Sequence, residues 1–373
     1  MTSSKEPFGI YIHVPFCLSK CPYCDFYSER DQKLVPNYVE AVKTELRTLE
    51  RCKGFVSPDI YEREVTSIYF GGGTPSLLAP SHIGSVIKCV KESFPVSTDA
   101  EITLECNPSV KEKDAFFLGI RQAGVNRVSL GLQSAVLSER RALGRLGSPE
   151  DAKNAVLAAK SAGIDDISLD IMLGIPGQTE ETLKESLDFA LSLPVTHLSV
   201  YILKLEEGTL FYKRRETLSL PDDDQTADMY LFMCSYLKEK GMRHYEISNF
   251  CFGDNIGRHN MSYWRCSEYL GVGPAAHSFV NSKRFYSERD LRGFLNGQKC
   301  VYDGPGGTEE ERLMLALRTD EGAAAPDTNA AFKKRAAEFA AMGLVNCKNG
   351  RAVLTEKGFL LSNYVISELL SVM

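Results

Sequence analysis

Residues 9–24, GIYIHVPFCLSKCPYC, place a run of apolar residues directly before three closely spaced cysteines. An apolar run of this length is typical of a β-strand buried on both faces. The thiols of Cys17, Cys21 and Cys24 follow at the point where such a strand would end. In a reducing compartment, clustered cysteines indicate metal ligands more readily than disulfides. The sequence therefore predicts a metal-binding loop after the first strand.

The number of thiols in this loop distinguishes between two kinds of metal site. A structural zinc ion usually takes four protein ligands, and the nearest candidates for a fourth are His13 and Asp25, without a second pair of thiols. A four-iron cube has four iron corners, so three thiolates leave one iron free to bind a molecule from solution. The spacing C-x3-C-x2-C therefore favours a 4Fe–4S cluster over zinc.

The sequence after this loop alternates between strand-like and helix-like segments. Strand-like runs, rich in Ile, Val, Leu and aromatic residues, cover residues 9–16, 67–73, 101–106, 127–133, 166–174 and 197–203. Helical patterns separate them at Pro36–Cys52, Ser81–Phe94, Lys111–Ala123, Pro149–Ala162 and Thr179–Leu193. Such alternation predicts an α/β fold with a parallel sheet. Six units fall short of the eight that close a full barrel, so we expect a partial (β/α)6 barrel over residues 1–204.

Several predicted strands end in residues that are unusual for a core. Residues 71–75, GGGTP, could bring bare backbone and its carbonyls close to a ligand amine, although a tight βα turn explains them equally well. Glu105 could bind ribose hydroxyls, or could belong to a helix-entry turn set by the following Asn and Pro. Gln133, Arg145 and Asp170 lie at or after the next two strands. In α/β barrels the sites lie at the carboxyl ends of the strands, so we expect these side chains to share a site.

Composition limits the function further. The 373 residues have a net charge of -6, and only the stretch around Arg214 is locally basic, so we expect no nucleic-acid partner. The sequence contains no run of about 18 apolar residues that could span a bilayer. The N-terminal stretch MTSSKEPFG lacks the apolar core of a signal peptide, and we therefore expect a cytoplasmic location.

Four motifs resemble one branch of a known superfamily. They are YIHVPFCLSKCPYCDFYS at residues 11–28, YFGGGTPS at 69–76, SLGLQS at 129–134 and LDIMLGIPGQT at 169–179. They look like the coproporphyrinogen oxidase-like branch of the radical S-adenosylmethionine (radical SAM) superfamily, and the resemblance covers nearly the whole chain. It implies that Cys17, Cys21 and Cys24 hold the cluster, whose open iron is chelated by S-adenosylmethionine. The residues implied to contact S-adenosylmethionine are Tyr11, Tyr23, Gly72, Gly73, Thr74, Glu105, Gln133, Arg145 and Asp170.

That branch contains an oxygen-independent coproporphyrinogen III oxidase and heme chaperones of the HemW type. The oxidase pattern has a fourth cysteine where this sequence has Phe26, and it has a long segment before the first strand, whereas Tyr11 follows only ten residues. Residues 259–264, HNMSYW, match the HNxxYW motif of the heme chaperones. The resemblance thus implies heme contacts at His259, Asn260, Tyr263 and Trp264, with the imidazole as an axial-ligand candidate. His277 is a less specific candidate, which we expect to be a buried hydrogen-bonding residue.

These features predict a heme chaperone that passes heme to acceptor hemoproteins such as respiratory cytochromes. Its cofactors would be the 4Fe–4S cluster, S-adenosylmethionine and heme. The alternative is an oxygen-independent coproporphyrinogen III oxidase or another radical SAM enzyme acting on a tetrapyrrole. Cleavage of S-adenosylmethionine in turnover, dimerisation and peripheral membrane association stay open.

The organisation of the chain changes after the predicted barrel. Residues 205–303 contain a helix in PDDDQTADMYLFMCSYLKEKG, capped near Asp222, and then the HNxxYW motif, and we interpret them as an extension of the barrel. The stretch YDGPGGTEEER at 302–312 is typical of a linker. Residues 304–373 have the pattern of two helices, a short hairpin and a last helix, which predicts a winged-helix-like α+β domain. Its evenly mixed charges favour a cap or an interface over DNA binding.

Overall fold

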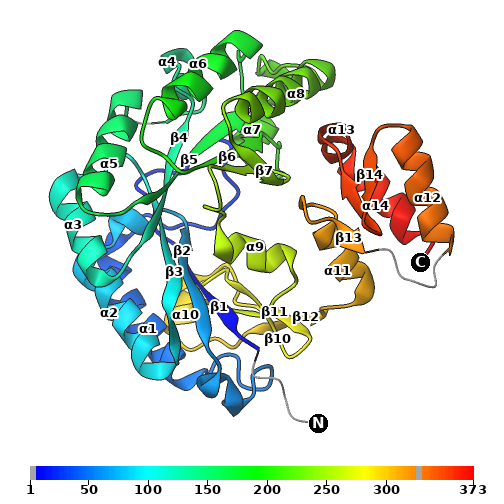
Figure 1. The fold of residues 1–373 in the computed structure, drawn as a ribbon. Helices are drawn as coiled ribbons and strands as arrows, with labels where there is room; N and C mark the ends of the chain where they lie inside the picture. Colours follow the sequence, from blue (N-terminus) through cyan, green and yellow to red (C-terminus); the bar gives the residue numbers. More distant parts are fainter. Residues whose placement is uncertain (1–5, 146, 325–329) are drawn as a thin grey trace.

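The central part of the protein is an open barrel of six parallel strands (Figure 1). The computed structural model describes residues 6–145, 147–324 and 330–373. The six strands are neighbours in sequence order, and each pairs in parallel with the next. They are β1 (Phe8–Val14), β2 (Val65–Gly72), β3 (Val96–Cys106), β4 (Arg127–Gln133), β5 (Asp166–Leu173) and β6 (His197–Ile202). The predicted partial (β/α)6 barrel is confirmed.

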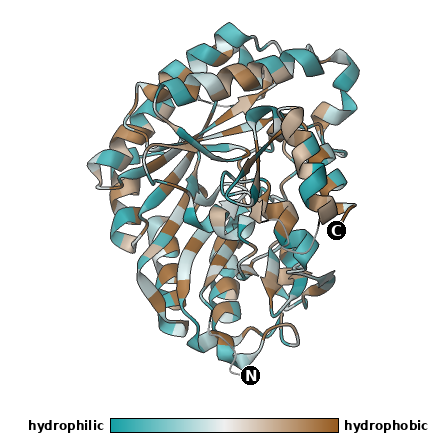
Figure 2. Ribbon diagram, turned by 45° about the vertical axis from the view of Figure 1, so that its right-hand side comes forward, coloured by the Kyte–Doolittle hydropathy of each residue, from teal (hydrophilic) through white to brown (hydrophobic). Residues whose placement is uncertain are grey.

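Helices cover the outer face of this sheet. They are α1 (Val35–Thr48), α2 (Pro80–Ser93), α3 (Lys113–Ala123), α4 (Leu137–Ala142), α5 (Pro149–Ser161) and α6 (Glu180–Leu191), with short 3-10 turns at Gln32–Leu34, Pro58–Glu62 and Pro75–Leu77. Ser148 and Thr179 form capping boxes that begin α5 and α6 by accepting hydrogen bonds from backbone N–H groups. Figure 2 shows apolar residues along the sheet and on the inner helix faces, with hydrophilic residues on the outer helix surfaces.

Alternation along each strand separates the two faces of the barrel wall. In β1, Ile10, Ile12 and Val14 belong to the large core formed with the outer helices. Tyr11 and His13 point the other way, into the lumen, where they hydrogen-bond to each other. The lumen side of the other strands is also polar. Burial of apolar residues on the outside thus fixes the barrel and leaves polar groups gathered inside.

The segment after β6 adds strands to both edges of the same sheet. Its helices are α7 (Leu210–Lys213), α8 (Asp223–Glu239), α9 (Arg258–Trp264) and α10 (Leu291–Leu295), with a 3-10 turn at Arg215–Thr217. Its strands are β7 (Arg243–Glu246), β8 (Asn249–Cys251), β9 (Tyr269–Val272), β10 (His277–Val280), β11 (Lys283–Tyr286) and β12 (Val301–Pro305). Strand β8 pairs with β6, while β9 pairs in parallel with β1, and the order of the twelve strands is β12-β11-β10-β9-β1-β2-β3-β4-β5-β6-β8-β7. As predicted, Asp222 caps α8.

The prediction of a linker at residues 302–312 is wrong in part. Val301–Pro305 forms β12, an edge strand that pairs with β11, and α11 begins at Glu309. Glycine and proline are depleted in strand interiors, but an edge strand tolerates both, and so the composition hid the strand.

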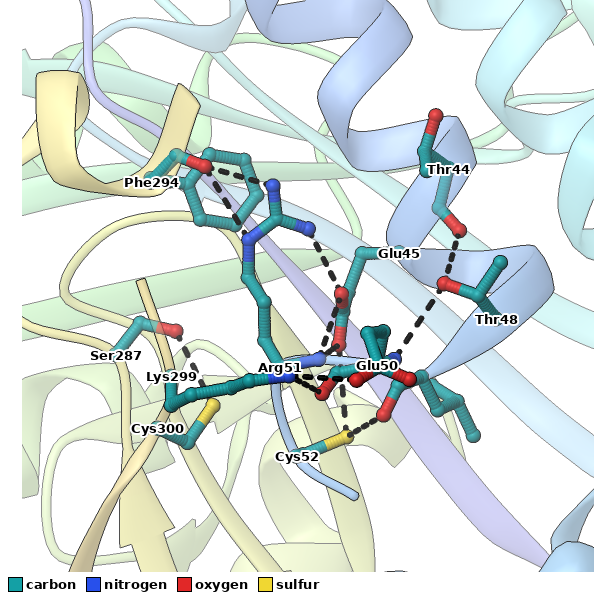
Figure 3. Close-up of polar contacts among 11 residues, drawn as sticks. Thr44, Glu45, Thr48, Glu50, Arg51, Cys52, Ser287, Phe294, Lys299 and Cys300 are labelled. Carbon is teal, nitrogen blue, oxygen red and sulfur yellow. Dashed lines mark hydrogen bonds and ion pairs between the residues drawn. The ribbon is translucent and has the colours of Figure 1, made fainter. Parts of the chain in front are cut away.

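A buried ion pair joins this extension to the first outer helix (Figure 3). The Arg51 guanidinium lies 2.8 Å from a carboxylate oxygen of Glu45, and both side chains are less than 10% exposed. Arg51 also donates two hydrogen bonds to the carbonyl of Phe294 in α10, and its guanidinium lies over the Phe294 ring. The backbone N–H of Cys300 donates to the Arg51 carbonyl. The polypeptide that returns past the barrel is therefore fixed to the end of α1.

The C-terminal residues form a smaller α+β unit beside the open side of the barrel (Figure 1). It contains α11 (Glu309–Ala316), β13 (Ala323–Ala324), α12 (Ala330–Ala341), β14 (Val345–Lys348), β15 (Arg351–Leu354), α13 (Glu356–Leu360) and α14 (Ser362–Leu370). The three strands form an antiparallel sheet in the order β13-β15-β14, which agrees with the predicted winged-helix-like domain. The last predicted helix is two short helices.

The boundaries at residues 204 and 303 stay predictions. Within the described ranges, no helix is long and apolar enough to cross a bilayer.

Candidate functional site

The three clustered cysteines lie on the loop that leaves the carboxyl end of β1. Their side chains are partly buried, and each is a free thiol. The loop is anchored to the end of β2, where the backbone N–H of Thr74 donates to the Phe16 carbonyl at 2.7 Å. The Cys17 sulfur lies 3.3 Å from the Thr74 hydroxyl. The predicted metal loop is thus held against the second strand.

The positions of the three thiols bear on the kind of metal site. Among the described residues, no three His, Cys, Asp or Glu side chains converge as the ligands of a single metal ion. A four-iron cube places each thiolate on a different iron, so its sulfur ligands need not converge on one point. Burial raises the pKa of Cys24, so a metal that binds this sulfur would have to displace its proton.

Arg145 connects the cysteine loop to the end of β4. One guanidinium nitrogen lies 3.9 Å from the Cys21 sulfur, and another donates to the carbonyl of Gly131 at 2.8 Å. Its buried Nε has no hydrogen-bond partner among the described residues. Gln133 ends the same strand in the left-handed region, with φ of 68°, which non-glycine residues rarely adopt. A Cβ at Gly131 would lie within 3.0 Å of both side chains, so the structure brings Gln133 and Arg145 together at the cysteine loop.

The glycines after β2 have two different roles. A Cβ on Gly72, whose φ is +109°, would lie 2.6 Å from the His13 ring, and one on Gly73 would lie 2.7 Å from the Phe16 carbonyl. These two residues are therefore required for close packing of the β1 and β2 ends. A Cβ on Gly71 would instead lie 3.0 Å from Glu105, Tyr11 and Tyr69, in the lumen. The turn interpretation explains Gly72 and Gly73, and their contact with S-adenosylmethionine stays a prediction.

Two carboxylates face the lumen between the cysteine loop and the base of the barrel. Glu105 accepts hydrogen bonds from the Tyr69 hydroxyl at 2.9 Å and from the Gly72 N–H at 3.2 Å. Burial, with the charge of Asp170, raises the pKa of Glu105 to about 7. Asp170 accepts from the Ser129 hydroxyl at 2.7 Å, and burial raises its pKa as well. The lumen thus holds two carboxyl groups that lack a cationic partner at contact distance within the described residues.

The two predicted tyrosines, Tyr11 and Tyr23, have different neighbours. The Tyr11 hydroxyl is 3.0 Å from Nδ1 of His13, and its ring lies beside that of Tyr69. Tyr23 packs against Phe211 with ring centroids 6.1 Å apart, at the edge of a small apolar cluster. Burial raises the pKa of Tyr23. Both tyrosines are positioned by other aromatic rings.

The HNxxYW motif forms α9 and enters the lumen from the amino-terminal end of the strands. His259 is fully buried; its Nδ1 lies 2.7 Å from the Ser67 hydroxyl and its Nε2 lies 2.7 Å from the Tyr263 hydroxyl. Its ring stacks on Tyr69, and burial lowers its pKa to about 4, so the imidazole is neutral. Both ring nitrogens are therefore hydrogen-bonded. Because the motif lies near Gly9, at the start of β1, about 16 Å of strand separates it from the β1 end that precedes the cysteines.

The other motif residues differ in their surroundings. Asn260 and Trp264 are partly buried. Trp264 is a hydrogen-bonding neighbour of Glu246, a buried carboxyl whose pKa burial raises to about 7. The expectation for His277 is wrong, because its side chain is 61% exposed, with the Asp303 carboxylate at 3.9 Å.

A layer of buried polar residues at the base of the lumen escaped the sequence interpretation. Arg127 is buried 3.5 Å from Asp166, and Glu101 accepts from the backbone N–H of His259. His197 lies between the hydroxyls of Ser168 and Tyr245. Charged and polar residues at every second strand position were the available signal, because they cannot face the apolar side of the wall.

Comparison with known proteins was made on sequence and on structure. Residues 11–190 match the model of the radical SAM superfamily. A protein of Mycobacterium tuberculosis named heme chaperone HemW is 33% identical over 98% of this chain and 95% of its own length. The Escherichia coli protein of that name is 37% identical over 78% of this chain and 76% of its own length. A mitochondrial mouse protein named radical S-adenosyl methionine domain-containing protein 1 is 36% identical over 86% of this chain and 75% of its own length.

Structural similarity agrees with this result at the level of the fold. The coproporphyrinogen III oxidase of Escherichia coli has a TM-score of 0.81 over 98% of this chain and 91% of its own, with 22% sequence identity. The similarity to the Mycobacterium tuberculosis HemW protein covers almost the full length of both sequences. The chain therefore belongs to the HemW family of the radical SAM superfamily.

Proposed function

We propose that this protein is a heme chaperone, which binds heme and transfers it to acceptor hemoproteins. The observation that carries the proposal is the 33% identity, along 98% of the chain, to a protein named heme chaperone HemW. The exposed Phe26, where the oxidase pattern has a cysteine, supports the same conclusion. The acceptors we expect are hemoproteins such as respiratory cytochromes, reached in the cytoplasm or at the membrane surface.

Membership of the radical SAM superfamily implies a 4Fe–4S cluster and S-adenosylmethionine. We propose that Cys17, Cys21 and Cys24 hold the cluster. The donor set fits, because all three thiols lie on one loop. The Nε of Arg145, next to Cys21, has no hydrogen-bond partner among the described residues and could donate to a sulfur or to a ligand. A bound cluster would supply electrons for cleavage of a carbon–sulfur bond in S-adenosylmethionine. The positive guanidinium would also stabilise thiolates against protonation.

For S-adenosylmethionine we propose a site in the lumen above Glu105 and Asp170. The sulfonium and amine of this molecule are cationic, and the two carboxyl groups lack a contacting cation in the described residues. Binding would therefore lower the raised pKa values of both groups and favour their ionised forms. The proposed contacts are Tyr11, Tyr23, Gly72, Gly73, Thr74, Glu105, Gln133, Arg145 and Asp170.

For heme we propose contacts on α9, at His259, Asn260, Tyr263 and Trp264. Use of His259 as the axial ligand would require its bond to Ser67 or to Tyr263 to break, since both ring nitrogens are occupied. The aromatic rings of Tyr263 and Trp264 could pack on a porphyrin without such a change. The two kinds of contact can be separated by experiment.

The proposal is tested with anaerobically reconstituted protein. We expect about four irons per chain, a reduced-cluster spectrum that S-adenosylmethionine perturbs, and binding of one heme. Changing all three cysteines to Ala should abolish the cluster, and Glu105→Ala should weaken S-adenosylmethionine binding. Coproporphyrinogen III, offered with reductant and S-adenosylmethionine, should be recovered unchanged. Decarboxylation of coproporphyrinogen III at a rate that meets the demand of growing cells would show that the protein is an oxidase and contradict the proposed chaperone function.

A further inference from the structure

A second polar site lies at the base of the barrel, on the outer side of the HNxxYW helix. It is a pocket of about 210 Å³ between the start of β2, α9 and the segment that leads into β9. Its lining residues are Thr66, Ser67, Arg258, Ser262, Arg265 and Ser267. Each of them carries a side-chain donor, although the hydroxyls of Thr66 and Ser262 already donate to backbone carbonyls, and none of the six is acidic or apolar. A pocket with this lining favours a ligand rich in acceptors and carrying negative charge.

The two arginines lie at the two ends of α9, where Arg258 is the first residue of the helix and Arg265 is its C-cap. Arg258, Ser262 and Arg265 are spaced at i, i+4 and i+7, so their side chains follow one another along the helix. Asp99 binds the guanidinium of Arg258, and Glu321 binds that of Arg265. A guanidinium has five N–H donors, and each arginine donates to its acidic partner through two of its three nitrogens. The carboxylates thus orient the arginines while donors remain for a ligand.

The pocket is joined directly to the buried histidine. The Ser67 hydroxyl, which lines the pocket, is 2.7 Å from Nδ1 of His259. The Ser262 hydroxyl donates to the His259 carbonyl at 2.7 Å. A ligand in the pocket would therefore lie one hydroxyl away from the HNxxYW imidazole.

The size of the pocket limits what it can hold. Its 210 Å³ is below the roughly 300 Å³ at which sites for whole small molecules begin, so a porphyrin ring would not fit inside. A carboxylate or a phosphate group would fit, and arginine recognises the planar or branched oxygens of both. Heme carries two propionate carboxylates on flexible arms at one edge of its ring.

We propose that this pocket is an oxyanion site whose ligand is a carboxylate or phosphate group, supplied by a propionate of heme when heme is bound. The propionate assignment rests on the proposed function, whereas the oxyanion site itself does not. Arg258 and Arg265 would supply the charge, and the hydroxyl of Ser267 would add a hydrogen bond to the ligand. The heme ring would then lie outside the pocket, against α9.

The first experiment compares heme with its dimethyl ester, in which the propionate charges are removed. Absorbance titrations would use the wild type, Arg258→Gln, Arg265→Gln and the double variant, with the exposed Arg292→Gln as the matched control. We expect each single variant to bind heme about tenfold more weakly, because a hydrogen bond between charged groups is lost. The wild type should bind the ester as weakly as the double variant binds heme, and Arg265→Lys should retain part of the affinity. Circular dichroism would confirm that each variant is folded.

The second experiment titrates inorganic phosphate into heme-free protein by calorimetry. Binding that the double variant loses and Arg292→Gln keeps would support the oxyanion site. Phosphate binding that depends on the arginines, with equal affinity for heme and its ester, would overturn the propionate assignment and leave free phosphate as the ligand. Equal heme affinity in all variants together with no phosphate binding would overturn the oxyanion site. Failure of the wild type to bind heme would contradict the proposed function. The phosphate titration would still show whether the pocket binds an oxyanion.

Discussion

The imidazole of His259 is held from three directions inside the barrel. Ser67 and Tyr263 occupy its nitrogens, and Tyr69 covers one ring face. Replacement by Ala leaves two buried hydroxyls without a partner and creates a cavity. We expect His259→Ala to lower the free energy of unfolding by about 2–4 kcal/mol, measured by urea denaturation of the cofactor-free protein. The exposed His277→Ala is the control, and equal effects of the two changes would show that these contacts do not stabilise the fold.

A second variant on α9 distinguishes between two roles of His259, as an iron ligand or as a structural residue. The Tyr263→Phe change removes the hydroxyl that occupies Nε2 while it keeps the aromatic ring. If His259 binds iron, the Soret band should change in His259→Ala and stay at its wild-type position in Tyr263→Phe. An unchanged band in both variants would remove His259 from the proposed heme contacts.

Glu246 should make the stability of the protein depend on pH. It is 1% exposed, and burial raises its pKa from 4.5 to about 7. The folded state therefore binds this proton more tightly than the unfolded state, so its contribution to stability is complete below about pH 4.5 and is lost as the pH rises to about 7. Glu246→Gln should reduce the change in unfolding free energy over this pH range by an amount on the order of 3 kcal/mol. Glu105, whose pKa is also raised to about 7, should contribute a similar pH dependence that the variant keeps.

Thermal and urea unfolding between pH 4.5 and pH 8 would measure this effect. The exposed Glu239→Gln change on α8 is the matched control, and its curve should follow that of the wild type. A slope that stays the same in Glu246→Gln would contradict the assignment of a buried, protonated carboxyl group.

Among individual residues, the sequence identified most clearly those whose type and spacing together imply one kind of chemistry. Cys17, Cys21 and Cys24 could be identified because few chemistries require three thiols at this spacing. The roles of Gly72 and Gly73 could not be separated from that of Gly71, since the difference depends on neighbours from another strand. The occupied nitrogens of His259 depend on Ser67, 192 residues away, and no local pattern contains that contact.

Among the elements, the parallel strands and their helices were the most predictable. Their apolar runs are long and regular, and each helix is covered on one face, so periodicity and capping residues locate them. The edge strand β12 was missed because it is short and contains Gly304 and Pro305. The return of β9 to pair with β1 is a long-range contact, and four residues of strand do not specify their partner.

The ion pair between Glu45 and Arg51 tests how one element is attached to the next (Figure 3). Arg51→Ala would leave the Glu45 charge buried without its partner and would release the Phe294 carbonyl of α10. We expect a loss of about 3–5 kcal/mol in the free energy of unfolding, measured by urea denaturation. Arg47→Ala, a change at an exposed position of α1, should alter stability by less than about 0.5 kcal/mol. Equal losses would indicate that α10 is held by other contacts.

In the whole molecule, the proposed cofactor and heme residues lie toward opposite ends of one lumen. The cysteines, Arg145 and Gln133 lie at the carboxyl ends of the strands, whereas α9 and the oxyanion pocket lie at the amino ends. Tyr69 spans the two, since it stacks on His259 and donates to Glu105. The small C-terminal unit contacts the same region through the pair of Glu321 with Arg265. If heme binds as proposed, this arrangement would let it enter and leave without passing the cysteine loop.

The central claim is that heme leaves this protein for an acceptor, and a transfer assay tests it most directly. Heme-loaded protein, with its cluster reconstituted, would be mixed anaerobically with an apo-cytochrome on a membrane vesicle, and the acceptor spectrum would be followed over time. We predict that the acceptor gains heme as the donor loses it, and that this transfer is faster than transfer from heme bound to serum albumin. Coproporphyrinogen III in the same mixture should be unchanged. Retention of heme by the donor, with conversion of coproporphyrinogen III to protoporphyrinogen, would contradict the claim.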